Sequence, residues 1–301
     1  MPLAKAELKS LLEEVLTSDL PAIDATSTTY SGDSVITVEL SFTKQAIQVF
    51  ETGYFLLTGK STAEDGWIPR VFSKEDYERF VDANAGGDPE LKAALAYCCQ
   101  ETTAGLELII KGSEASSTVM ASLAHEAGHA RQRIINPGQS EFSHDTAVGA
   151  VKEAEAFAFE TALIRKLGEY AGVNATLIPV ESTASSVIRD WTAHVQANIL
   201  DVTREHLRGR ALLWLSVLHD PILVDMRSEL ADRRILSPES LLILHDHFVG
   251  MNPDDIAEYT NRLFSEFQND RNSIEAALLS SFATVPLEGF VRHSFGVFLM
   301  P

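Results

Sequence analysis

Helical spacing of apolar residues dominates the later part of this chain and limits the folds open to it. From about Ser182 onward the pattern is helical throughout, with helix start signals at Ser237-Pro238-Glu239 and Asn252-Pro253-Asp254-Asp255. Two helices are also predicted upstream, from Ser116 to about Asn136 and from about Ala147 to Tyr170. A chain with this pattern must build its core mainly by packing helices.

Strand patterns are confined to the first half. Ile36, Val38, Leu40 and Phe42 alternate with polar residues, which is typical of a strand with one buried face. The run LELIIK at 106–111 lies between glycines and predicts a second strand. Helices are predicted for the amphipathic amino terminus, for 43–57, for 73–81 and from Asp88-Pro89 to about Gln100.

These elements predict an α+β fold that is mostly α, with a small sheet in the first half. The length of 301 residues and the 45% apolar content suit one elaborated domain or two packed subdomains. We place a boundary near residue 176, which separates a candidate catalytic region, 1–176, from a helical region, 177–301, forming the other side of a cleft.

Composition excludes several kinds of partner. The formal charge of −19, from 24 basic and 43 acidic residues, argues against nucleic acid, whose phosphates need a basic face. No stretch has the roughly 20 apolar residues of a membrane-spanning helix, so no membrane is expected. Cys98 and Cys99 are adjacent, which makes a bridge between them awkward, and no other cysteine is present. We therefore expect a reducing, cytoplasmic setting.

The sequence HEAGH lies in the middle of the predicted helix that begins at Ser116. His125 and His129 are four residues apart, so both imidazoles project from one face and can bind one ion. Catalytic zinc uses three protein ligands and leaves a fourth position for water. Glu126 can take the proton of a zinc-bound water and deliver it to the leaving amine. The motif predicts a zinc hydrolase.

Chance remains an alternative for this motif. An accidental HExxH is expected on the order of once in fifty chains of this composition. The capped helix, the short strand before it and the small residues around the motif, Ala121, Ala124, Ala127 and Gly128, favour a metal site over chance.

The HEAGH helix resembles that of the zincin metallopeptidases, and more narrowly the gluzincins, whose third zinc ligand is a glutamate on a second helix. The segment EAEAFAF at 153–159 resembles the second motif of the ImmA/IrrE-type metallopeptidases. This resemblance implies a zincin-like domain, peptide-bond hydrolysis and Glu155 as the third ligand, with strand 106–111 along the substrate cleft. Phe157 stands where that motif has Asn or Asp.

The residues around Glu155 also favour it as the ligand. Val151, Ala158, Phe159 and Ala162 share its helical face and give it an apolar surround, where an ionised carboxylate needs a cation. The competing candidates are Glu153, which shares a face with Ala156, Phe157 and Glu160, and Glu160 itself.

His219 is the candidate donor of a hydrogen bond to the oxyanion of the tetrahedral intermediate, although a histidine at a helix end need not have this role. The sequence thus predicts a zinc-dependent peptidase acting on a peptide or protein. The alternatives are a catalytically silent zinc-binding regulatory or interaction protein, and a helical scaffold with an accidental motif.

Overall fold

A computed structural model describes most of the first 172 residues and parts of the remainder. The described residues are 2–17, 32–72, 74–84, 86–87, 96–98, 106–111, 116–136, 146–172, 209, 212–213, 215–217, 219–233 and 236–269. They form two compact units, one of residues 1–131 and 166–173, the other of residues 132–165 and 174–301. The predicted boundary near residue 176 stays a prediction.

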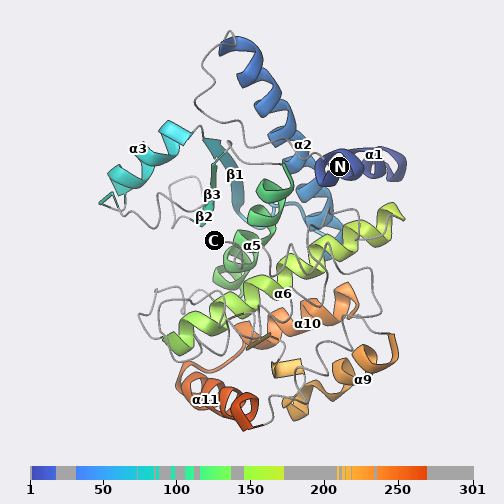
Figure 1. Cartoon of the computed structure of the whole chain (residues 1–301), viewed down its shortest axis with the longest axis vertical. Helices are drawn as coiled ribbons and strands as arrows, with labels where there is room; N and C mark the ends of the chain where they lie inside the picture. Colours follow the sequence, from blue (N-terminus) through green and yellow to red (C-terminus); the bar gives the residue numbers. More distant parts are fainter. Residues whose placement is uncertain are drawn as a thin grey trace. The chain divides into compact units, whose positions relative to one another are not determined.

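The first unit begins with two helices that pack together, α1 (Lys5–Thr17) and α2 (Gly32–Thr58) (Figure 1). Leu8 and Leu12 of α1 are buried, which confirms the amphipathic helix predicted at the amino terminus. The buried residues Ala46, Val49, Phe50 and Tyr54 follow helical spacing along α2. The predicted helix at 43–57 is therefore confirmed.

The strand predicted at Ile36, Val38, Leu40 and Phe42 is wrong, because these residues lie within α2. Alternation over only seven residues also places apolar residues four apart, as in Ile36 and Leu40, so it satisfies a helix as well. No proline or glycine separates this stretch from the helical stripe after it. Extending an existing helix costs far less than starting a new element, so the helix continues.

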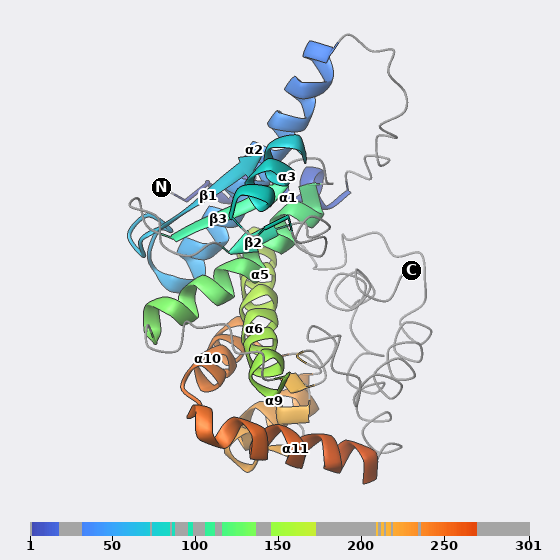
Figure 2. The same cartoon turned by 90° about the vertical axis from the view of Figure 1, so that its left-hand side faces the viewer.

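A small sheet follows α2 in the first unit (Figure 2). The strands β1 (Trp67–Phe72), β2 (Ala96–Cys98) and β3 (Leu106–Lys111) are arranged in the order β1-β3-β2. β1 pairs parallel with β3, and β2 pairs antiparallel with it. Helix α3 (Lys74–Asn84) follows β1 and precedes β2 in the chain, and it packs on β1 and β3.

Two sequence predictions are confirmed around this sheet, and one is wrong in part. β3 occupies 106–111 as predicted, and α3 confirms the helix predicted from Ser73. The helix predicted from Asp88-Pro89 to about Gln100 is wrong at 96–98, which form β2. The rest of that prediction, 88–95 and 99–100, lies outside the described residues.

The predicted fold class, a zincin-like α+β domain, is contradicted by the balance of the elements. Three helices alone contain 27, 20 and 26 residues, whereas the strands contain 6, 3 and 6. The described chain is predominantly helical, and its three described strands form one small sheet in the first unit. The one segment wrongly assigned to a strand, 36–42, adds to the helical content as part of α2.

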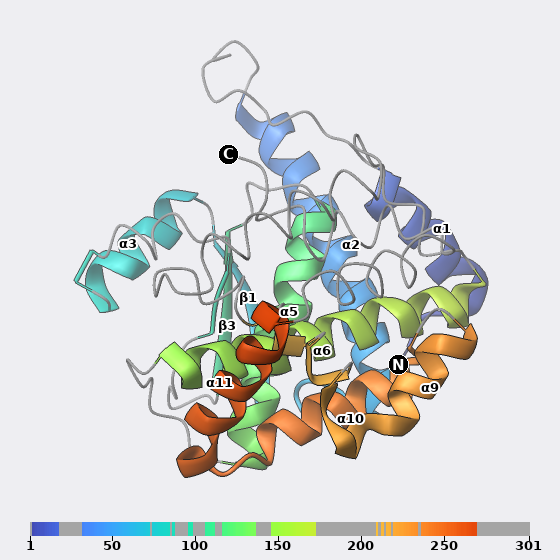
Figure 3. The ribbon, with the colours of Figure 1, turned by 60° about the horizontal axis from the view of Figure 1, so that its bottom comes forward.

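The second unit is helical throughout its described part, and α10 (Pro238–Val249) lies beside α6 (Thr146–Ala171) (Figure 3). His245 of α10 has Nδ1 3.0 Å from the carbonyl oxygen of Glu155, and Arg165 of α6 donates to the carbonyl of Leu236. The other elements are η3 (Pro221–Leu223), α9 (Val224–Arg233) and α11 (Pro253–Asn269).

The capping signals read from the sequence are confirmed in this unit. Ser237 is the N-cap of α10 and accepts a hydrogen bond from the N–H of Ser240 at 3.2 Å. Asn252 accepts one from the N–H of Asp254 just before α11. None of the described helices combines the length and apolar character needed to cross a membrane.

Candidate metal centre

Helix α5 (Ser116–Ile135) carries the HEAGH motif and confirms the helix predicted there. The His125 and His129 rings are one turn apart, with centroids 5.0 Å from each other and planes at 86°. The side of α5 opposite the two histidines is packed in the core by small and apolar residues, namely Leu123, Ala124, Ala127 and Ala130. His125 is buried with 8% exposed, and His129 is half-buried.

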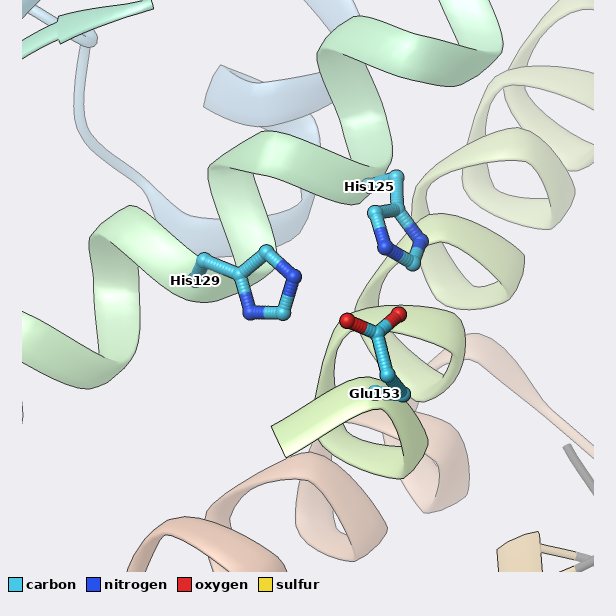
Figure 4. A group of neighbouring side chains, drawn as sticks. All are labelled: His125, His129 and Glu153. Atoms are coloured by element: carbon cyan, nitrogen blue, oxygen red, sulfur yellow. The ribbon is translucent and has the colours of Figure 1, made fainter. Parts of the chain in front are cut away.

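Glu153 of α6 completes a group that could hold a metal ion (Figure 4). One ligand atom from each of His125, His129 and Glu153 lies within 4.8 Å of the others. Figure 4 shows the Glu153 carboxylate turned towards the two imidazoles. Two nitrogen donors and one carboxylate form the donor set of many catalytic zinc sites.

The distances fit an ion after a small contraction. Zinc binds these donors at about 2.0–2.1 Å, so ligand atoms in a tetrahedral site are about 3.4 Å apart. The ligand atoms of His125, His129 and Glu153 are at most 4.8 Å apart, and rotations of the side chains about their χ angles can bring them to about 3.4 Å. Imidazole nitrogen favours transition metals such as zinc over calcium and magnesium, which prefer oxygen.

The structure brings Glu153 to the histidines, rather than the predicted Glu155. Residues two apart on a helix point about 200° away from each other, so the side chains of Glu153 and Glu155 cannot share a face. Glu155 is 2% exposed, as its apolar neighbours predicted, and its backbone carbonyl faces His245. Its burial therefore reflects packing within the second unit and did not identify the ligand.

Glu160, the third candidate, is buried with 4% exposed but is not in the group. It shares the helical face of Glu153 and lies about 10 Å further along the axis of α6. Helical phase alone therefore left Glu153 and Glu160 equivalent, and only the position along the helix separates them.

The two predicted catalytic residues, Glu126 and His219, differ in their distance along the chain from the metal-binding histidines. Glu126 is half-buried on α5, directly after His125. His219 is half-buried before Asp220, whose carboxylate caps η3 by accepting the N–H of Ile222 at 2.9 Å. Among the described residues His219 is not in the metal-binding group, and its oxyanion role stays a prediction.

A polar cluster lies close to the carboxyl-terminal half of α5 within the first unit. Tyr54 donates to Asp65 at 2.6 Å, Lys60 forms an ion pair with Asp65 at 2.9 Å, and the Arg131 charge acts on both. Burial, and then the bond to Asp65, raises the pKa of Tyr54 well above its ordinary value. Burial opposes ionisation of Asp65, but the bonds from Tyr54 and Lys60 outweigh it and lower the pKa of Asp65.

This cluster has an aromatic side. Trp67 of β1 meets Tyr54 edge-on, with centroids 5.0 Å apart, and Phe50 packs on both rings. The cluster therefore joins α2, the turn at 59–66 and β1. Arg131, whose charge acts on it, lies on α5 two residues after His129.

No family model, curated protein or solved structure matches this chain. The comparisons thus assign it to no family, and the likeness of its motifs to gluzincins stays a prediction.

Proposed function

We propose that this chain is a zinc-dependent peptidase whose metal centre is His125, His129 and Glu153. The single observation that carries the proposal is the approach of Glu153 of α6 to His125 and His129 of α5, with their ligand atoms within 4.8 Å of one another. Glu126 lies on α5 beside the two histidines. Chance can produce an HExxH motif, but it does not supply a third ligand from another helix at the same point.

Each residue has a defined role in this proposal. His125 and His129 provide neutral imidazole nitrogens, and Glu153 provides a carboxylate that offsets part of the ion's charge. A bound zinc ion would polarise the scissile carbonyl and make water more acidic. Glu126 takes a proton from the attacking water and passes it to the leaving amine, as a carboxylate beside a metal ligand can.

The substrate class follows from charge and from the chemistry of the group. With 43 acidic and 24 basic residues, the chain is poorly suited to nucleic acid and better suited to neutral or basic peptides. We infer a peptide or protein substrate and, from the adjacent Cys98 and Cys99, a cytoplasmic setting.

Phe157 favours a second candidate, a metal-binding regulatory protein without turnover. It is 3% exposed on α6, one turn after Glu153, where the resembled motif carries a polar residue. Polar groups around metal ligands orient them and raise activity, and an apolar ring supplies neither effect. Metal binding would then persist without hydrolysis.

Cleavage of a mixed peptide library by the zinc-loaded full chain separates the two candidates. We expect cleavage that Glu126→Gln lowers by about a hundredfold or more, because the amide cannot accept the proton. The variant should retain its zinc, which shows that the site itself is intact. Cleavage by Glu126→Gln at the wild-type rate would exclude Glu126 as the base, and zinc binding without any cleavage would favour the regulatory protein.

A further inference from the structure

Gly209 lies against the backbone of α6 at the proposed ligand Glu153. A Cβ atom added at Gly209 would lie 2.3 Å from Cβ of Glu153, 2.9 Å from the Ala154 nitrogen and 2.9 Å from the Glu153 carbonyl carbon. All three distances are below the 3.0 Å that real Cβ contacts respect. Any other residue at this position must therefore move its surroundings.

The reason for glycine here is space rather than backbone conformation. Gly209 is helical and buried, and its φ angle is outside the left-handed region that favours glycine. Alanine would suit a helix better than glycine by roughly 1 kcal/mol, so the local sequence preference opposes the residue found. The close approach to α6 explains why a glycine stands at this position.

We propose that Gly209 is a positioning residue of the metal centre, whose missing side chain lets its helical turn pack on α6 and fixes Glu153. The proposal rests on the metal centre proposed above. Two of the three atoms in conflict belong to the α6 backbone, so rotation of the Glu153 side chain cannot relieve the overlap. The backbone that carries the ligand has to move.

The size of that movement is large for a metal ligand. The 2.3 Å separation is about 1 Å short of the 3.4 Å at which ordinary contact begins, whereas ligand distances in a metal site hold to about 0.2 Å. An added methyl group at Gly209 therefore displaces Glu153 by several times the tolerance of the site.

The described residues that follow Gly209 are themselves held in place. Its buried residues Leu212 and Leu213 are 0% and 3% exposed. Ser216 donates to the carbonyl of Leu212 at 2.7 Å, and Tyr259 of α11 donates to Ser216 at 2.9 Å. These contacts hold the described residues after Gly209 within the second unit, so we expect the strain of an added methyl group to fall on α6.

The test compares Gly209→Ala with Gly250→Ala in the full chain. A Cβ at Gly250 would approach only carbonyl oxygens of its own helix, at 3.2 and 3.7 Å, so this variant controls for the substitution itself. We measure the affinity for zinc and the visible absorption spectrum of bound Co²⁺, which reports the coordination geometry. We expect Gly209→Ala to bind zinc at least about tenfold more weakly with an altered cobalt spectrum, and Gly250→Ala to match wild type.

A double variant shows whether the effect passes through Glu153. In a Glu153→Ala background the ligand is already lost, so adding Gly209→Ala should leave the residual zinc affinity unchanged. An equal loss in both backgrounds, or a Gly209→Ala protein with wild-type affinity and spectrum, overturns the proposal. A wild-type chain that binds neither metal instead refutes the metal centre, so the two failures are distinguishable.

Leu213→Ala replaces Gly209→Ala if the latter does not fold. It loosens the same segment without adding an atom against Glu153. The proposal then predicts weaker zinc binding with an altered cobalt spectrum, and unchanged values would overturn it.

Discussion

Replacing Glu153 and Glu155 separately by glutamine tests which glutamate of α6 binds the metal. Both substitutions keep the side-chain shape and remove one negative charge, and the two sites differ mainly in their helical face. Glu153 has a carboxylate oxygen within 4.8 Å of the imidazole nitrogens, whereas Glu155 is not in that group. Only the first substitution should therefore weaken metal binding directly.

The expected magnitude follows from the number of ligands. Removing a group that only orients a ligand lowers metal affinity by about 10–100-fold, so removing one of three ligands should cost at least about 100-fold. That factor corresponds to about 2.8 kcal/mol of binding free energy. Glu155→Gln should remain within about threefold of wild type, since its side chain lies about 200° round the helix.

The assay is competition for zinc with a chelating dye at neutral pH, using the full chain. Glu155 is buried, so its variant can lose folding stability, and urea unfolding of the metal-free proteins measures that loss separately. A weaker hold on zinc in Glu155→Gln than in Glu153→Gln would refute the geometry described above.

Three further predictions concern stability. The pKa of Asp65 is lower in the folded chain than in the unfolded chain, so its ionised carboxylate stabilises the fold fully above the unfolded pKa, and this stabilisation is lost as pH falls through the folded pKa. Urea unfolding should therefore show a steeper loss of stability below about pH 4 in wild type than in Asp65→Asn. Burial lowers the pKa of His247 although Asp220 opposes this, so stability should fall as pH drops below about 6.5; His247→Gln should flatten that fall between pH 8 and 5, and an equally steep curve would refute the assignment. Ser237→Ala should cost about 1 kcal/mol by removing the cap of α10, and an unchanged denaturation midpoint would contradict this.

The sequence predicted α5 well because several local signals agree there. Apolar spacing, a cluster of hydroxyl residues at its start and the stop at Asn136-Pro137-Gly138 define the helix, and four-residue spacing then places His125 and His129 on one face. No long-range contact is needed for this part of the site, so it could be predicted from the sequence.

The third ligand depends on tertiary contacts, and local pattern could not supply them. Both faces of α6 are apolar, with Ala154, Ala156, Phe157, Ala158 and Phe159 all buried, so the apolar surround that favoured Glu155 in the sequence does not distinguish its face from that of Glu153. Packing against α10 occupies the face of Glu155, which leaves Glu153 for the histidines. Gly209 gave no signal, because its contact with α6 spans 56 positions of sequence.

The errors in the sheet have a similar cause. The sequence predicted no element for β1, which has Pro69 in its middle; β1 is an edge strand, where proline is tolerated. The three residues of β2 are too few to show a period and are held by pairing with β3. Pairing partners distant in sequence determine both strands.

Metal analysis of the purified full chain shows whether His125, His129 and Glu153 form a zinc site. We expect about one zinc per chain in the wild type and loss of that stoichiometry in His125→Ala, His129→Ala and Glu153→Ala, because two remaining ligands hold zinc poorly. Asp65→Asn, which alters the polar cluster near α5 without removing a ligand, should keep its zinc. A wild-type chain without metal, or one whose metal content is unchanged in the histidine variants, would contradict the account.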